Sequence, residues 1–341
     1  MRSTLQRSAV TVLALSVTLL PGLSGCRAGD PPVEAQAPAA PQVLSSPAPA
    51  ELLSPAASPS LTPESSPTPR PVPALGRVFI IVLENREFSQ VVGNATAPNL
   101  QRWIGEGGSL TEYYAVDHPS FPNYLALIAG DTFGIDYNCE DCYQPGPMLA
   151  DQVEASGRDW RAYVEGMPEP CFDQTVGNYA KRHNPFVYFE TLRRDPDRCQ
   201  AKVVPFPAFW DDLNSNRLPD LVWLIPDICN GGHDCALSVS DAWLAEVVEA
   251  IRRSTAYSPD ALIAILWEEG ASDGGCCGLA EGGKVAVILL SPLLAPGAQD
   301  HTLYTHYSLL KTLEAGWGLD YLGHAADPET ALIEAIWRAA P

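Results

Sequence analysis

The chain has 341 residues, and its 41 Asp and Glu against 21 Lys and Arg give a formal net charge of −20 at pH 7. This acidic balance argues against nucleic-acid binding and against a basic surface patch for anionic lipids. An anionic small molecule remains a compatible ligand, provided that a cation lies in its site.

The first 25 residues have the pattern of a lipoprotein signal peptide. Arg2 and Arg7 precede an apolar run at 9–20, which is too short to span a bilayer, because spanning needs about 20 residues. The following LSGC at 23–26 resembles a bacterial lipobox and predicts cleavage before Cys26 and lipidation of its thiol. Several acyl chains would anchor the protein to the cell membrane or the outer membrane. The alternative is an ordinary signal peptide with an incidental cysteine.

Residues 26–74 are predicted to be a disordered tether. Thirteen of the chain's 32 prolines lie between Pro31 and Pro73, interleaved with Ala and Ser. A segment of this composition cannot bury enough apolar surface to offset the entropy lost on ordering. It would hold a folded domain away from the membrane surface.

Residues 75–341 are long enough for one large domain, and they contain no internal repeat and no second linker. In chain order, the patterns predict a strand at 77–85, helices at 123–130 and 148–157, a strand at 220–227, a helix at 240–254, strands at 261–270 and 284–292, and a helix at 307–318. Continuous Val, Ile and Leu runs are typical of strands covered on both faces. The alternation predicts an α/β fold with a mostly parallel central sheet and helices on both faces.

Besides Cys26 the chain has eight cysteines, an even number that indicates four disulfides in an exported protein. Local spacing favours Cys139–Cys142, Cys229–Cys235 and the vicinal pair Cys276–Cys277, which leaves Cys171–Cys199. The other interpretation of the CxxC at 139–142, a zinc or redox motif, lacks a second suitably spaced CxxC. Spacing alone leaves the pairing open, because eight cysteines allow 105 connectivities.

Three of the predicted strands end in polar groups. Glu84 and Asn85 follow the first, Glu268 and Glu269 follow the third, and the second leads into Asp227 and the segment CNGGHDC at 229–235. Ligands bind beyond the carboxyl ends of strands in open α/β sheets, so these groups are expected to converge. Carboxylate and amide oxygens are suitable ligands for a divalent cation, which would also relieve their mutual repulsion.

Ser120 lies between Pro119 and Pro122, which restrict the backbone around it, and an apolar run follows. A serine at the start of a helix places a nucleophile where backbone N–H groups and the helix dipole favour an anion. The combination fits phosphoryl transfer through a phosphoserine. The alternative is an ordinary helix N-cap.

Eight segments together are similar to the ordered motifs of a known family. They are VLENREF, HPSFPNYLAL, YAKRHNPFVYF, CNGGHDC, SDAWL, LWEEG, ILLSP and THYSLLKTLE, and they occur in this order from Val78 to the C-terminus. They resemble the bacterial phosphoesterase family of acid phosphatases and phospholipases C, which belongs to the alkaline-phosphatase-like superfamily.

The resemblance implies roles at the matching positions. Ser120 matches the nucleophile, and His183 matches a site histidine that orients or protonates the leaving oxygen. Asn123 and Lys181 would help to bind the phosphate. The implied metal ligands are Glu84, Asn85, Glu268 and Glu269, with Asn85 also contacting the phosphate.

Two departures from the family pattern limit the expected metal content. Position 268 is Glu where the family has Asp, a longer side chain that can still ligate. A His that follows the acidic pair in many relatives is absent here. One metal ion is therefore expected rather than two. His233 and Asp234 are candidate substrate-binding residues, with a merely structural disulfide loop as the alternative.

The sequence therefore predicts a membrane-anchored, extracytoplasmic and metal-dependent phosphomonoesterase of the acid-phosphatase type. Its partner would be a small phosphorylated substrate or a lipid head group, and the protein is expected to be a monomer. A phospholipase C-type phosphodiesterase is the alternative within enzymes, disfavoured because such relatives tend to be longer. A non-catalytic binding module on the same fold is the alternative of another class, and the presence of Ser120 counts against it.

Overall fold

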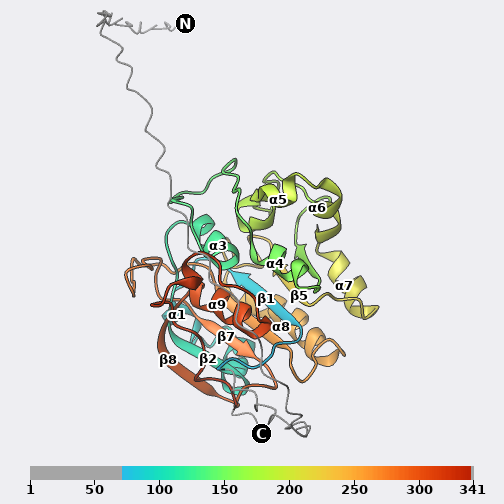
Figure 1. Cartoon of the computed structure of the whole chain (residues 1–341). Coiled ribbons are helices and arrows are strands. Elements are labelled where there is room, and N and C mark those ends of the chain that lie inside the picture. The colour runs from blue at the N-terminus through green and yellow to red at the C-terminus, as the bar shows by residue number, and fades with distance from the viewer. Residues whose placement is uncertain (1–70, 339–341) are drawn as a thin grey trace, which may run out of the picture. The chain divides into compact units, whose positions relative to one another are not determined.

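The computed structural model describes residues 71–338, in which helices pack against an eight-stranded sheet (Figure 1). The strands lie in the order β4-β3-β5-β1-β6-β7-β2-β8. Their bounds are β1 Val78–Leu83, β2 Gly108–Tyr114, β3 Trp160–Val164, β4 Val203–Pro205, β5 Leu221–Ile225, β6 Leu262–Trp267, β7 Val287–Leu290 and β8 Ala298–Thr305.

The sheet is mostly parallel, as the sequence predicts, with β7 as the exception. Strands β4, β3, β5, β1 and β6 pair in parallel, and β7 runs antiparallel to both β6 and β2. All six residues of β1 are buried, because helices cover both faces of the sheet and β5 and β6 flank its edges. Burial on every side explains the unbroken apolar sequence VFIIVL.

The four predicted strands are confirmed as β1, β5, β6 and β7, whereas β2, β3, β4 and β8 were not predicted. The missed strands β2 (GSLTEYY) and β8 (AQDHTLYT) are rich in polar residues, and β8 is an exposed edge strand. Strands β3 and β4 have only five and three residues. Long-range pairing stabilises these strands, and a local pattern does not reveal it.

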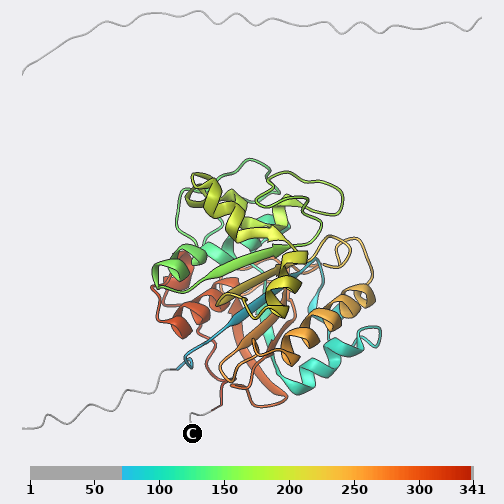
Figure 2. The ribbon, with the colours of Figure 1, turned by 90° about the vertical axis from the view of Figure 1, so that its right-hand side faces the viewer.

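Helices cover both faces of the sheet. The longer ones are α2 Pro98–Glu106, α3 Ser120–Ala129, α4 Leu149–Ala155, α6 Pro196–Lys202, α7 Pro207–Asn214, α8 Leu237–Arg253 and α9 His306–Trp317; α1 Phe88–Val91 and α5 Glu190–Arg193 are single turns. Helices α2 and α8 lie on one face and α3, α4 and α9 on the other (Figure 2). The four predicted helices are confirmed as α3, α4, α8 and α9, and the predicted fold class is confirmed with them.

All four disulfides pair as local spacing suggests. The bonds are Cys139–Cys142, Cys171–Cys199, Cys229–Cys235 and Cys276–Cys277. Disulfides persist in oxidising compartments, so this set indicates an extracytoplasmic location.

Packing of the domain begins a few residues before the predicted start at residue 75, since Val72 is already buried. Leu75 is also buried, and its N–H donates to the carbonyl of Gly316 at 3.1 Å. The predicted signal peptide, the Cys26 lipidation site and the tether up to residue 70 lie outside the described residues. Between residues 71 and 338, no helix has the length and apolar character needed to cross a bilayer.

Glu314, near the end of α9, is a buried carboxyl remote from the strand ends discussed below. Its Oε1 accepts a hydrogen bond from the N–H of Leu322 at 3.0 Å, and its Oε2 has no hydrogen-bond partner among the described residues. Burial raises the pKa of this carboxyl to about 8. The folded state therefore holds a proton that the unfolded chain releases near the usual value of 4.5.

We expect Glu314→Gln to reduce the pH dependence of stability. A raised pKa in the folded state adds stability that is fully present below about pH 4.5 and is lost as pH rises through about 8. The variant should therefore gain stability relative to wild type as pH rises across this window. Thermal unfolding at several pH values measures this gain. Glu246→Gln, at an exposed glutamate of α8, is the control, and an equal pH profile for Glu314→Gln and wild type would contradict the prediction.

Candidate active site

Three predicted site residues lie together because two parallel strands end side by side. Strands β1 and β6 pair in register, with Leu83 opposite Trp267 at their carboxyl ends. The next residue on each strand is a glutamate, Glu84 on β1 and Glu268 on β6, and Glu269 follows. Glu84, Glu268 and Glu269, here called the carboxylate cluster, are all buried. The predicted convergence of strand ends is therefore present for β1 and β6.

Backbone hydrogen bonds hold Glu268 in place. Its Oε2 accepts from the N–H of Asn85 at 3.1 Å and from the N–H of Glu269 at 2.7 Å. Asn85 has a φ of 51°, in the left-handed region that asparagine tolerates better than most residues. The backbone carbonyl of Glu268 lies 2.6 Å from Nε2 of His306, the first residue of α9.

Ser120 is the first residue of α3, and its side chain points at the carboxylate cluster. The Oγ donates a hydrogen bond to Oε1 of Glu269 at 2.9 Å. The N-cap position belongs to Pro119, which has no capping side chain, and Oδ1 of Asn138 accepts from the N–H of Phe121 in the first turn at 3.1 Å. The alternative interpretation of Ser120 as an ordinary N-cap is therefore wrong. Its hydroxyl donates to a carboxylate instead of accepting from a backbone N–H.

Aromatic and imidazole groups complete the surroundings of the cluster. Tyr124, one helical turn after Ser120, donates its hydroxyl to Oε1 of Glu84. Nε2 of His183 lies 3.1 Å from Oε2 of Glu84. His118 Nδ1 contacts Glu269, and its Nε2 lies 3.1 Å from the carbonyl of Ser272.

The buried charges shift each other's pKa values. Burial, followed by the charges of Glu84 and Glu269, raises the pKa of Glu268 well above its usual value. Burial also raises the pKa of Glu84, and it lowers that of His183, on which the charge of Arg182 acts in the same direction. The positive charge of Arg182 lowers the pKa of Glu84, but burial outweighs this effect.

The donor set fits the implied divalent cation. Oε2 of Glu84 and Nε2 of His183 are buried, face each other, and have no hydrogen-bond partner within residues 71–338. Carboxylate and amide oxygens with one imidazole are ligands that divalent cations accept. As arranged here, however, no group of three or more His, Cys, Asp or Glu in the described part of the chain has a geometry ready to hold a metal ion. The carboxyls are instead hydrogen-bonded to neighbouring groups.

The amide of Asn85 connects this cluster to His233. The neighbouring acceptors fix the orientation of this amide. Its NH2 donates to Glu269 Oε1 at 2.5 Å and to Glu268 Oε1 at 3.1 Å. Its oxygen then lies 3.3 Å from Nε2 of His233. Asp234 accepts from Nδ1 of His233 at 2.6 Å and so orients the ring.

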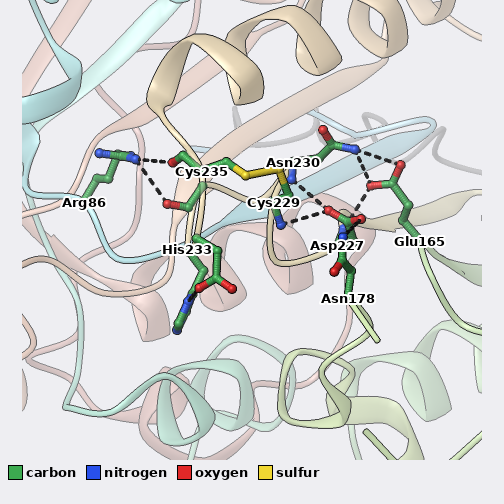
Figure 3. The surroundings of a disulfide bond; sticks show 10 residues. Arg86, Glu165, Asn178, Asp227, Cys229, Asn230, His233 and Cys235 are labelled. Carbon is green, nitrogen blue, oxygen red and sulfur yellow. Dashed lines mark hydrogen bonds and ion pairs between the residues drawn. A yellow bond between two sulfur atoms is a disulfide. The ribbon is translucent and has the colours of Figure 1, made fainter. Parts of the chain in front are cut away.

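The loop that carries His233 is fixed by the Cys229–Cys235 disulfide and by polar contacts on two sides (Figure 3). On one side, Nη2 of Arg86 donates to the carbonyls of Gly232 at 3.2 Å and Cys235 at 2.7 Å. On the other, Asn230 donates to Glu165 at 3.0 Å, and Asp227 accepts from the N–H groups of Cys229 and Asn230. The loop is therefore a rigid support for His233.

Comparison with known proteins assigns the chain to a family. A family model described as the phosphoesterase family matches residues 104–320. A phosphatidylinositol-3-phosphatase of Mycobacterium tuberculosis is 31% identical over 262 residues, which cover 75% of this chain and 81% of the relative. An acid phosphatase of Aspergillus fumigatus is 31% identical over 266 residues, covering 73% of this chain and 56% of the relative.

This chain belongs to the phosphoesterase family. The predicted resemblance is thereby confirmed. The chain spans less than two thirds of the length of the fungal acid phosphatases that it matches, for example 61% of the phosphate-repressible enzyme of Penicillium chrysogenum.

Solved structures support the fold of this phosphoesterase family member. A protein in the alkaline phosphatase superfamily from Vibrio parahaemolyticus aligns with a TM-score of 0.53 at 14% identity, covering 79% of this chain and 76% of that one. The lipoteichoic acid synthase of Listeria monocytogenes aligns with a TM-score of 0.54 at 10% identity, covering 75% of each chain. At these identities the comparison concerns the fold alone.

The two predicted phosphate-binding residues Asn123 and Lys181 make other contacts. Asn123 is fully buried, and its Oδ1 accepts from the N–H groups of Val116 at 2.8 Å and Asp117 at 3.1 Å. It thus shapes the loop before Ser120. Lys181 lies against Tyr143 and Tyr188, and its ammonium donates to the carbonyl of Glu140. Neither side chain forms a hydrogen bond with the carboxylate cluster.

Three residues in or beside the site were not predicted as site residues. Tyr124 follows Ser120 at the i+4 spacing that places both on one face of a helix, so the helical pattern could have revealed it. His118 precedes Pro119 by one position. Arg182 lies between the two residues Lys181 and His183 that the family motif singled out. Neither of the last two carries a local signal of its own.

Proposed function

We propose that this chain is an extracytoplasmic, metal-dependent phosphomonoesterase that acts through a phosphoserine at Ser120. The observation that carries the proposal is the hydrogen bond of 2.9 Å from Ser120 Oγ to Glu269 Oε1. It places a hydroxyl at the N-terminal end of α3 next to three buried carboxyls, where a proton acceptor and an anion-favouring helix end meet.

In the first step Ser120 Oγ attacks phosphorus, and the bond from phosphorus to the leaving oxygen breaks. The seryl proton passes to Glu269, which already accepts the hydrogen bond of the hydroxyl. The leaving oxygen takes a proton from water. Neutral His183 stays beside Glu84 and orients the leaving group as a hydrogen-bond donor.

In the second step a water molecule attacks phosphorus of the phosphoserine, and the bond from phosphorus to Oγ breaks. Glu269 returns its proton to Oγ, and inorganic phosphate leaves. Glu84, Asn85, Glu268 and Glu269 would hold the divalent cation, which when bound supplies positive charge to the phosphate oxygens.

The names of the relatives favour monoesters. Acid phosphatases and a phosphatidylinositol-3-phosphatase both act on phosphomonoesters, one class small and the other a lipid head group. A phosphorylated head group also suits a protein held at a membrane by a lipid anchor. Both kinds of substrate present the same phosphate group.

The test uses the full-length protein, assayed on 4-nitrophenyl phosphate and on bis(4-nitrophenyl) phosphate, with and without a chelator. We expect turnover of the monoester that is lost on chelation. Faster turnover of the diester would favour a phospholipase C-type activity. Absence of turnover with every divalent cation tested would favour a non-catalytic binding module.

The anchor has its own test, because it rests on Cys26 alone. Replacing Cys26 with Ala removes the thiol to which the acyl chains attach, so the protein is expected to leave the membrane fraction or to stay unprocessed. Fractionation followed by immunoblotting measures this. A variant found in the membrane fraction at the wild-type level and correctly cleaved would refute the lipoprotein prediction.

A further inference from the structure

Arg182 forms no ion pair within residues 71–338, and it lies beside His233 of the candidate site. Most arginines of the described residues bind a carboxylate, namely Arg102, Arg161, Arg193, Arg194, Arg198, Arg217 and Arg252. Arg182 has no such ion pair within residues 71–338, and its buried Nε has no hydrogen-bond partner there. In a chain with a net charge of −20, a cation left without a carboxylate is available for an external anion.

The position of Arg182 is set by its two neighbours in the chain and by His233. It lies in a short 3₁₀ segment, Lys181–His183, between two buried residues, and is itself partly exposed. Its Nη2 lies 3.3 Å from Nε2 of His233. The amide oxygen of Asn85 lies 3.3 Å from the same Nε2 atom, and the amide NH2 contacts Glu269, the acceptor of the Ser120 hydrogen bond. Nε2 of His233 therefore lies within 3.3 Å of both the guanidinium and the amide of Asn85, and with its Nδ1 proton directed at Asp234 it accepts from Nη2 of Arg182.

We propose that Arg182 binds a non-bridging oxygen of the substrate phosphate and makes the site selective for phosphomonoesters over phosphodiesters. The inference rests on the proposed function and adds the residue that decides the substrate class. A monoester is a dianion near neutral pH and a diester is a monoanion. Three carboxyls repel both substrates, so the dianion gains more from one fixed cation.

A guanidinium suits this task better than the ammonium of Lys181. Its planar donors match two phosphate oxygens at once, and it stays charged when partly buried. The Lys181 ammonium is already bound to a carbonyl and packed on aromatic rings. The rigid disulfide loop supports His233, against which the guanidinium rests, so its position is fixed before the substrate arrives.

The experiment compares Arg182→Gln and Arg182→Lys with wild type on 4-nitrophenyl phosphate and methyl 4-nitrophenyl phosphate. Loss of a hydrogen bond to a charged group should lower kcat/KM for the monoester by about 10- to 100-fold in Arg182→Gln. The diester value should change by less than about threefold. Arg182→Lys keeps the positive charge but lacks the planar pair of N–H donors, so a partial loss of kcat/KM for the monoester is expected. Arg194→Gln is the control, because Arg194 pairs with Glu190 at the surface.

Equal losses of kcat/KM for both substrates in Arg182→Gln would indicate a structural role and would overturn the proposal. An unchanged kcat/KM for the monoester would overturn it as well. A second measurement separates this inference from the proposed function. Inorganic phosphate is titrated calorimetrically into Ser120→Ala and into Ser120→Ala/Arg182→Gln, where turnover plays no part. We expect at least tenfold weaker binding in the double variant. Equal affinity would overturn the role of Arg182 even in an active enzyme, whereas wild type inactive on both esters would overturn the proposed function.

Discussion

Replacing Ser120 with Ala is expected to abolish phosphomonoester turnover while leaving the protein folded. The variant lacks the oxygen that forms the covalent bond to phosphorus, so kcat should fall by at least about 10³-fold at every metal concentration. Stability should change little, because the hydroxyl makes one side-chain hydrogen bond, worth about 1–3 kcal/mol to a charged acceptor. Steady-state kinetics and thermal unfolding of the purified variant measure the two effects.

A matched control is Ser308→Ala. Ser308 is also a buried serine in the first turn of a helix, and its Oγ accepts from the N–H of Thr305 at 3.1 Å. Removing this capping hydroxyl should cost about 1 kcal/mol and leave kcat near the wild-type value. A folded Ser120→Ala protein that keeps more than a few per cent of wild-type kcat would falsify the covalent mechanism.

Removing the divalent cation, or one of its proposed ligands, is expected to have the second large effect. Chelation should abolish activity, and a suitable cation should restore it. Glu84→Gln and Glu269→Gln should each lower kcat/KM by about 10²-fold or more, because a neutral amide is a weaker ligand than a carboxylate. High metal concentration should rescue both in part, and Glu269→Gln less, because it also lacks the proposed acceptor of the Ser120 proton.

Stability provides a readout that does not depend on activity. Added cation should raise the melting temperature of wild type, because it binds only the folded state. In metal-free protein, Glu268→Gln should melt higher than wild type, since it replaces one of three crowded buried carboxyls by a neutral group. It should also lose most of the stabilisation by metal. The exposed Glu246→Gln should match wild type in both respects, and a metal-free Glu268→Gln that melts well below wild type would count against the carboxylate cluster as a metal site.

The acidic strand ends could be predicted because fully buried strands have an unmistakable composition. β1 and β6 are continuous apolar runs, and the polar residue that ends each run marks the edge of the sheet. The order of the strands could not be predicted in the same way. Only long-range pairing shows that β1 and β6 are neighbours and that Glu84 and Glu268 lie side by side.

Lys181 and Arg182 illustrate which feature of the site could not be predicted from the sequence. A 3₁₀ segment has about three residues per turn, so two adjacent side chains point in directions roughly a third of a turn apart. Which of them faces the carboxylates depends on distant partners. Tyr143 and Tyr188 pack against Lys181 and leave Arg182 beside His233. Asn123 is a similar case, since its role in shaping the loop at 116–119 appears only from the folded backbone.

The central position of β1 has a consequence for the order of events during biosynthesis. Among the strands of residues 71–338, β1 is the first to emerge from the ribosome or the export channel, yet both strands that flank it come much later, β5 ending at Ile225 and β6 at Trp267. Glu84 therefore has no acidic partner until nearly two hundred further residues have followed. Pairing at such sequence separations is slow, because a long loop must close first. A nascent chain thus carries Ser120 without Glu269, its proposed proton acceptor, and the carboxylate cluster can form only after β6 and Glu269 have emerged.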